Sequence, residues 1–148
     1  MPPLLLLLLI AVTAAAFLIS AVLRKASSAR LAALASTWQM RFTPEDRFQL
    51  TPRIAAHFPT PGAADVVLRN LIYGQEAAGS YRYFFTIEYT LGVVRTKRRR
   101  VAVGMLLETA RGPNASPFSG VTLAPPDLPL AQQYEWLRQQ HGASLPTQ

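Results

Sequence analysis

The sequence predicts an α+β protein, in which an N-terminal transmembrane helix is followed by a small antiparallel β-meander packed with short helices. Three observations predict it: an uncharged apolar run opens the chain, apolar and polar residues alternate in its middle, and an amphipathic helical pattern lies near its end. Its 148 residues suffice for one small domain beside the apolar run. The expected parts are a tail (1–3), a transmembrane helix (4–23), a juxtamembrane helix (24–38), an α+β domain (39–142) and a flexible tail (143–148).

The transmembrane helix is predicted from residues 4–23, which contain no charged side chain. At about 1.5 Å of rise per residue, a helix of this length spans roughly 30 Å, the hydrocarbon thickness of a bilayer. A cleaved signal peptide is the alternative, and such peptides carry a positive first region and a shorter apolar region. Only Met1, Pro2 and Pro3 precede the leucines. We therefore expect a retained single-pass anchor.

The orientation of this anchor is predicted from its flanking charges. Arg24, Lys25 and Arg30 follow the apolar run and no basic side chain precedes it. Basic residues close to a membrane segment stay on the cytoplasmic side. We expect a protein of the cell (inner) membrane with its N-terminus outside and its domain in the cytoplasm. The absence of cysteine is compatible with a reducing compartment. An envelope protein with the same anchor and an exported domain remains the alternative.

Small side chains form a stripe on the apolar helix. Thr13, Ala16 and Ser20 share one side of it, and small residues let a second membrane helix approach closely. A membrane protein partner, in addition to the lipid bilayer, is one interpretation. The other is that small residues are tolerated anywhere in such a helix.

The helical pattern continues beyond the apolar run, and its apolar side is expected to begin the domain core. The alternative is that this stretch extends the anchor or lies along the membrane interface, with Trp38 at the headgroup level. That side carries Leu31, Leu34 and Trp38. In Thr43-Pro44-Glu45-Asp46, a threonine cap, a proline and two acids suit a helix start, which explains the adjacent carboxylates without a metal or acid–base site. A second short helix is expected from Thr51 to His57.

Three strands are expected in the middle of the chain: Val66–Tyr73, Tyr81–Thr90 and Val101–Thr109. In the second, the odd-numbered positions carry aromatic and β-branched side chains that share one face. These are Tyr81, Tyr83, Phe85, Ile87 and Tyr89. In the third, the shared face carries Val101, Val103, Met105 and Leu107. We expect an antiparallel meander with one apolar face.

Residues 110–129 are expected to be a loop, because glycines and prolines recur there. A last helix should open near Asp127 or Pro129 and stop at Gly142. Its apolar side carries Leu130, Tyr134, Leu137 and His141. This helix is expected to cover the apolar face of the sheet.

A basic run occupies residues 95–100, at the hairpin tip and the start of the third strand. Its cations are Arg95, Lys97, Arg98, Arg99 and Arg100. All charged residues follow the apolar run, so the part of the chain after this run carries the whole net charge of +7. Beside an anionic bilayer each Lys or Arg is worth about 1 kcal/mol. Contact with anionic lipid headgroups or an acidic partner is therefore expected, and the alternative is that the charges only keep a strand edge soluble.

A membrane-tethered nucleic-acid-binding module is a further alternative, but nucleic acid is the less expected partner. Nucleic-acid readers show exposed aromatic platforms beside basic residues. Here the aromatic side chains share their face with Ile87, which indicates burial.

Catalysis is not expected. The chain lacks cysteine, its two histidines, His57 and His141, are far apart, and it has no glycine-rich phosphate loop. We therefore expect no catalytic residue, no cofactor and no metal. The predicted role is a non-catalytic accessory or interaction protein, such as a subunit of a membrane protein complex.

Four short segments carry a resemblance to a known family. They are Trp38, "FTPED" at 42–46, "LRN" at 68–70 and "FTIEYT" at 85–90, followed by a basic second hairpin strand. Over about residues 36–108 the chain resembles a family of uncharacterised single-pass membrane-anchored proteins of high-GC actinobacteria. Arginine supplies 13 of the 15 basic residues, which agrees with a high-GC source. The resemblance implies an anchor and an α+β domain, and it transfers no site residue.

Overall fold

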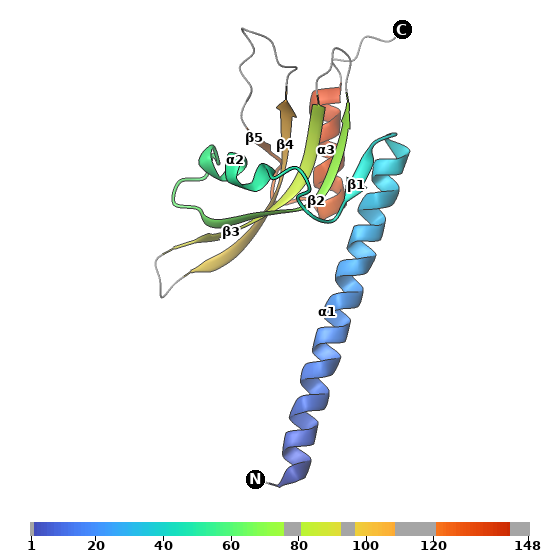
Figure 1. Cartoon of the computed structure of the whole chain (residues 1–148), viewed down its shortest axis with the longest axis vertical. Helices are drawn as coiled ribbons and strands as arrows, with labels where there is room; N and C mark the ends of the chain where they lie inside the picture. Colours follow the sequence, from blue (N-terminus) through green and yellow to red (C-terminus); the bar gives the residue numbers. More distant parts are fainter. Residues whose placement is uncertain (1, 76–80, 93–96, 109–120, 143–148) are drawn as a thin grey trace. The chain divides into compact units, whose positions relative to one another are not determined.

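The computed structural model describes residues 2–75, 81–92, 97–108 and 121–142. The chain divides into two compact units, residues 1–30 and residues 31–148. Its elements in chain order are α1 (Pro3–Thr37), β1 (Arg41–Thr43), α2 (Leu50–Ala56), β2 (Ala64–Gln75), β3 (Tyr81–Leu91), β4 (Arg98–Glu108), β5 (Val121–Leu123) and α3 (Leu130–Gly142) (Figure 1).

The first unit is the apolar part of α1. Its large apolar side chains, from Leu4 to Leu23, are all well exposed. By length and composition alone, α1 could cross a membrane, and a signal sequence near an N-terminus meets the same criterion. A long apolar N-terminal helix is therefore a feature of this structure.

The second unit begins inside α1. Leu31 and Ala35 are 1% and 0% exposed, and Leu34 and Trp38 pack against the same core. The expectation that this side of the helix begins the domain core is confirmed. The compact unit starts at Leu31, eight residues before the expected domain boundary, because the last turns of α1 are themselves core elements.

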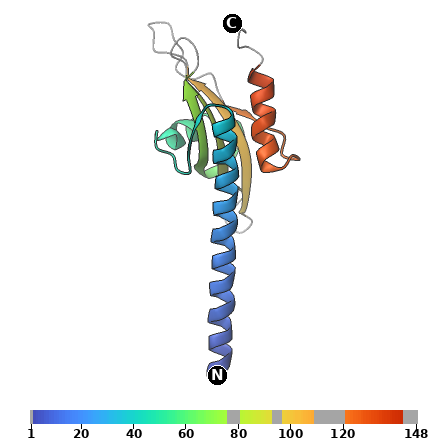
Figure 2. The same ribbon diagram turned by 90° about the vertical axis from the view of Figure 1, so that its right-hand side faces the viewer.

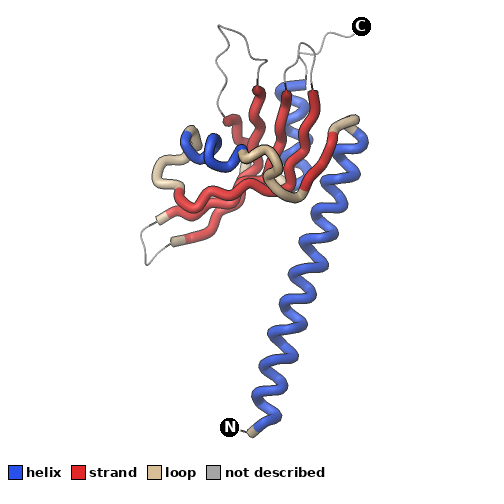
Figure 3. The backbone as a smooth tube through the Cα atoms, viewed as in Figure 1, coloured by secondary structure: helices blue, strands red, loops and turns tan. Residues whose placement is uncertain are grey.

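Five strands form one antiparallel sheet in the order β1-β2-β3-β4-β5 (Figure 3). The predicted meander of three strands is confirmed and forms its centre. The short outer strand β5 was not predicted, because it is three residues long and lies in a segment rich in turn residues. Helix α3 is confirmed, with Tyr134 and Leu137 fully buried.

The prediction of a single apolar face is wrong, because helices cover both faces of the sheet. Figure 2 shows α2 and α3 on opposite sides of it. The register explains the difference: Phe84 pairs with Met105, and Phe85 pairs with Gly104. Paired residues share a face, so the odd-numbered side chains of β3 lie with the even-numbered side chains of β4. The two predicted apolar rows therefore face opposite ways.

Two hydrophobic clusters result. The cluster on the α3 side combines the end of α1 with strands and α3, and its buried members are Leu31, Ala35, Ile72, Phe84, Val103, Met105, Ala124, Tyr134 and Leu137. The cluster on the α2 side has as buried members Leu50, Ile54, Leu68, Leu71, Tyr83, Phe85, Ile87 and Leu106. The odd-numbered aromatics of β3 were expected to lie under the last helix, but Tyr83 and Phe85 pack with α2 instead.

Strand β2 is irregular at two places. Its register with β3 shifts between Ala64 and Val67 and again between Arg69 and Ile72. Asp65 and Asn70 lie at these shifts with φ of 52° and 51°. A left-handed residue that adds one position to a strand is a β-bulge, and it turns the following side chains to the other face. The second bulge places Leu68 and Leu71, which are three residues apart, in the same cluster.

The expected helix start at Thr43 is wrong. Thr43 ends β1, and its hydroxyl donates to the Glu45 carbonyl at 3.2 Å. The Asp46 carboxylate accepts from the backbone N–H groups of Leu50 at 3.0 Å and Thr51 at 2.7 Å, and from the Thr51 hydroxyl at 2.7 Å. Asp46 therefore satisfies the free N–H groups at the start of α2. The predicted second short helix is confirmed by α2 itself.

Candidate functional site: the basic arm

The central strands extend beyond the five-stranded part of the sheet. Strand β1 pairs only with Leu71–Tyr73, and β5 only with Gly104–Leu106. Residues 64–69 of β2, 86–91 of β3 and 98–103 at the start of β4 therefore form a three-stranded ribbon, preceded on the β4 side by Lys97, which extends to the lower left in Figure 1. We call this ribbon the basic arm.

The strand alternation divides the basic run between the two faces of the arm. In the register of β3 with β4, Arg98 pairs with Leu91, Arg99 with Thr90 and Arg100 with Tyr89. Successive side chains of a strand point to opposite faces. Arg99 therefore lies on the α3 side, and Arg98 and Arg100 lie on the α2 side. Lys97 is described with them, and Arg95 is outside the described residues.

Acidic side chains compensate the cations on one side of the arm. Glu88 forms ion pairs with Arg69, at 3.3 Å, and with Arg99. Asp65 forms an ion pair with Lys97 at 3.5 Å and accepts a hydrogen bond from the Thr90 hydroxyl at 3.0 Å. Lys97 and Arg99 therefore serve partly to hold the three strands together.

Arg98 and Arg100 differ from their neighbours. Both are exposed, and neither forms an ion pair with any residue that the structure describes. Their β3 neighbours, Leu91 and Tyr89, are half-buried and carry no charge. All of these cations are exposed, but those on this face have no acidic partner in the described arm, whereas on the other face Glu88 and Asp65 offset Arg69, Lys97 and Arg99.

No aromatic platform accompanies these cations in the described part of the arm. Tyr83, Phe85 and Ile87 are 5%, 0% and 0% exposed, because α2 packs over them. Tyr89 packs its ring edge-on against Phe58, with 4.9 Å between the ring centroids. The Tyr83 and Phe85 rings are therefore not exposed beside these cations.

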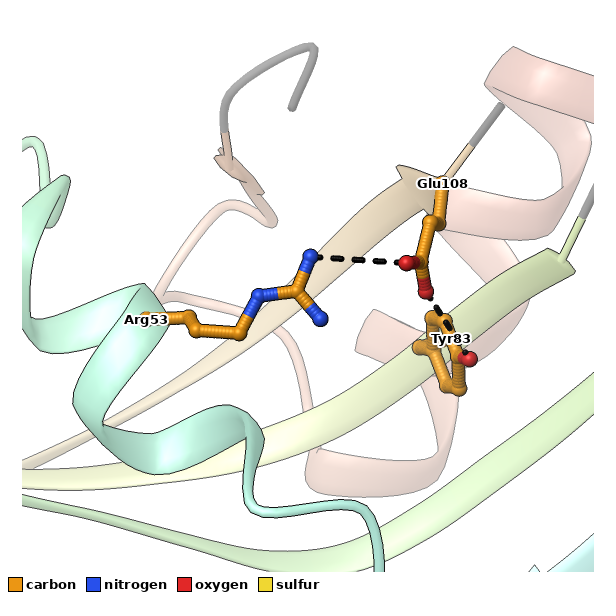
Figure 4. A network of polar contacts seen from close by, with 3 residues as sticks. All are labelled: Arg53, Tyr83 and Glu108. Carbon is orange, nitrogen blue, oxygen red and sulfur yellow. Dashed lines mark hydrogen bonds and ion pairs between the residues drawn. The ribbon is translucent and has the colours of Figure 1, made fainter. Parts of the chain in front are cut away.

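A second polar cluster joins α2 to the sheet (Figure 4). The Tyr83 hydroxyl donates to Glu108 at 3.2 Å, and an Arg53 guanidinium N–H donates to the other oxygen of Glu108 at 3.4 Å. Burial and the neighbouring Glu108 carboxylate raise the pKa of Tyr83 to about 12. The phenol therefore keeps its proton at neutral pH and acts as a donor, not as a base. Sequence reasoning did not single out these residues, because they are far apart in the chain.

The other polar residues that the sequence singled out are the two histidines and Asp46. His57 is exposed at the end of α2, and the His141 side chain is not described. No group of three or more metal-ligating side chains occurs among the described residues. Burial opposes the charge of Asp46, but hydrogen bonds from Leu50, Thr51 and Phe48 outweigh it and lower the pKa of this carboxyl. Its role is the helix cap.

The predicted helix-packing stripe lies on α1. Thr13, Ala16 and Ser20 are exposed, and the Thr13 hydroxyl donates to the Leu9 carbonyl one turn earlier. This bond satisfies the hydroxyl within its own helix, as an apolar environment requires.

Comparisons of the chain with protein-family models, with curated proteins and with solved structures find no match. The role of the protein is therefore inferred from its own residues.

Proposed function

We propose that this protein is a single-pass protein of the inner membrane, anchored by α1, with its N-terminus outside and residues 31–148 in the cytoplasm. The domain acts as a non-catalytic accessory or interaction protein, and its basic arm binds an anionic partner at the membrane. The apolar, exposed face of α1 and the cations that follow it support the anchor and its orientation. The resemblance to actinobacterial membrane-anchored proteins is consistent with the same arrangement.

The observation that carries the binding proposal is the placement of Arg98 and Arg100. They lie on one exposed face, while Lys97 and Arg99 are paired with acids on the other. A cation that already has a carboxylate neighbour gains little from a second anion, whereas an unpaired one gains about 1 kcal/mol near an anionic surface. Such contacts weaken with ionic strength, because salt screens exposed charges.

The test uses a soluble fragment that begins at Arg24, mixed with vesicles rich in phosphatidylglycerol and, separately, with polyglutamate. The double variant Arg98→Gln with Arg100→Gln should lose binding to at least one of these probes. The matched control, Lys97→Gln with Arg99→Gln, removes the same number of charges and should lose much less. Thermal melting of each fragment checks its fold. Equal losses in both variants, or no binding to either probe, would refute the proposed role of this face.

The orientation is tested separately with cysteines, because the natural chain has none. Pro2→Cys and Gln139→Cys place thiols at exposed positions in the two units. In intact cells an impermeant thiol reagent should label Pro2→Cys and should reach Gln139→Cys only after lysis. The reverse pattern would contradict the cytoplasmic domain and favour an envelope protein with an exported domain.

A further inference from the structure

We propose that the outer edge of β4 in the basic arm is a docking edge for an extended acidic segment of a partner protein, which adds a strand to the sheet. This inference rests on the proposed function, because it names the class of partner that the same arm would bind.

The outer edge of β4 is only partly paired. Strand β5 pairs with Gly104–Leu106, and the Ala124 N–H extends this contact by donating to the Val103 carbonyl at 2.9 Å. From Arg98 to Ala102, no strand among the described residues lies on the outer side of β4. This stretch is nevertheless regular, because it pairs residue by residue with β3 on its inner side.

The contact at Val103 shows which backbone groups face outward. In an antiparallel strand the N–H and C=O of one residue point to the same side, and those of the next residue point to the other. Since the Val103 carbonyl bonds outward to Ala124, the backbone groups of Val101 and Arg99 also point outward. An added strand would therefore find two N–H donors and two C=O acceptors at alternate residues of this edge.

The opposite edge of the arm is a poor docking edge. On β2 the bulges at Asp65 and Asn70 interrupt the repeat of backbone groups, since both residues have positive φ. Bulges are a common way to block unwanted pairing at a sheet edge. The arm thus has an interrupted edge on β2 and a regular edge on β4. An added strand is therefore expected to pair with β4.

The side chains of β4 define the chemistry of the occupant. Arg98 and Arg100 flank the added strand on one face, where acidic residues would lie beside them. On the other face Val101 is 54% exposed beside Arg99, whose charge is paired with Glu88, so an apolar neighbour there would bury the Val101 side chain. The expected occupant is therefore a strand in which acidic and apolar residues alternate. A second copy of β4 is excluded, because it would place arginines against arginines.

The experiment uses the full chain in nanodiscs of zwitterionic lipid. The probe is a fluorescent, end-capped peptide of about ten residues, a length within the range of natural strands, in which Glu and Val alternate. A peptide of the same composition in scrambled order is the control. Fluorescence anisotropy should show that the alternating peptide binds at least about tenfold more tightly than the scrambled one, because only it matches both faces.

The critical variant is Val101→Pro. Proline lacks the backbone N–H, which at residue 101 points away from β3, so the pairing of β3 with β4 should be kept. Binding of the alternating peptide should weaken by about tenfold or more. Val101→Thr, which keeps the N–H and the β-branched shape, should bind within about twofold of the natural chain. Peptides N-methylated at every second residue supply a second measurement that leaves the protein unchanged. Methylation on the docking edge of the peptide should abolish binding, and methylation on its outer edge should not.

The outcomes separate this inference from the proposed function. If Arg98→Gln with Arg100→Gln abolishes binding but Val101→Pro and N-methylation do not, the arm recognises charge alone, and strand docking is refuted while the proposed function stands. Strand docking is also refuted if the chain binds anionic vesicles and neither peptide. If the arginine variant changes binding to no anionic probe, the proposed function itself is refuted.

Discussion

The buried hydroxyl of Tyr134 offers a stringent test of the fold. Tyr134 is 0% exposed, and its hydroxyl donates to the Asn70 carbonyl at 2.8 Å. A phenol has one proton, so the Thr86 hydroxyl, 2.7 Å away, must donate to Tyr134 in turn. These two bonds join α3 to the centre of β3 and to the second bulge of β2.

We expect Tyr134→Phe to destabilise the domain by roughly 2–3 kcal/mol. The change removes two hydrogen bonds worth about 0.5–1.5 kcal/mol each, and it deprives two groups in the core of a partner, which adds to the cost. The ring stays, so no cavity larger than the lost oxygen forms. For a domain of this size the melting temperature should fall by about 10 °C.

The assay is thermal or urea unfolding of the domain, with Tyr81→Phe as the matched control. Tyr81 is 41% exposed, and its hydroxyl has no hydrogen bond among the described contacts. Removing it should change stability by less than about 0.5 kcal/mol. Adding Thr86→Val to Tyr134→Phe should cost less than the sum of the two single changes, because both remove the same bond. A Tyr134→Phe variant as stable as the control would show that the hydroxyl is not buried and bonded as described.

Three further predictions concern packing, pH and the start of the domain. Gly104→Ala should destabilise the domain by about 1–3 kcal/mol in urea unfolding, because its new methyl group would lie 2.9 Å from the Phe85 ring; an unchanged midpoint would contradict this packing. Because folding lowers the pKa of Asp46, its ionised carboxylate stabilises the domain at pH values above the unfolded pKa of about 3.9. This stabilisation is lost as the pH falls through the folded pKa. The melting-temperature difference between the natural chain and Asp46→Asn should therefore be full at pH 7 and shrink below about pH 4; a constant difference would contradict this. Leu31→Ala should cost about 2–5 kcal/mol of domain stability and Leu23→Ala none, as measured by unfolding; equal effects would place the start of the core elsewhere.

The alternation in Tyr81–Thr90 was sufficient to predict a strand and to group its odd-numbered side chains correctly. It could not show which side of the sheet those side chains occupy. That depends on the pairing of Phe85 with Gly104, which a hairpin longer or shorter by one residue would change. Because α2 is only seven residues long, its pattern also gave little sign that it would pack against one face of the sheet.

The basic run illustrates the same limit at the candidate site. Its composition predicted an exposed cationic segment, and Arg98 and Arg100 are exposed as expected. The pairing of Arg99 with Glu88, and of Lys97 with Asp65, depends on strand register and on the first bulge of β2. Neither feature leaves a periodic signal in the sequence.

The agreement between strand order and chain order has a consequence for how the protein folds. Each strand pairs with the one made just before it, so the sheet can form in the order in which its strands are synthesised. The cluster that contains both Leu31 and Leu137 is different, because its members come from the two ends of the domain. It can be completed only when almost the whole chain has left the ribosome, so a chain stalled before α3 would expose that side of its sheet to chaperones and proteases.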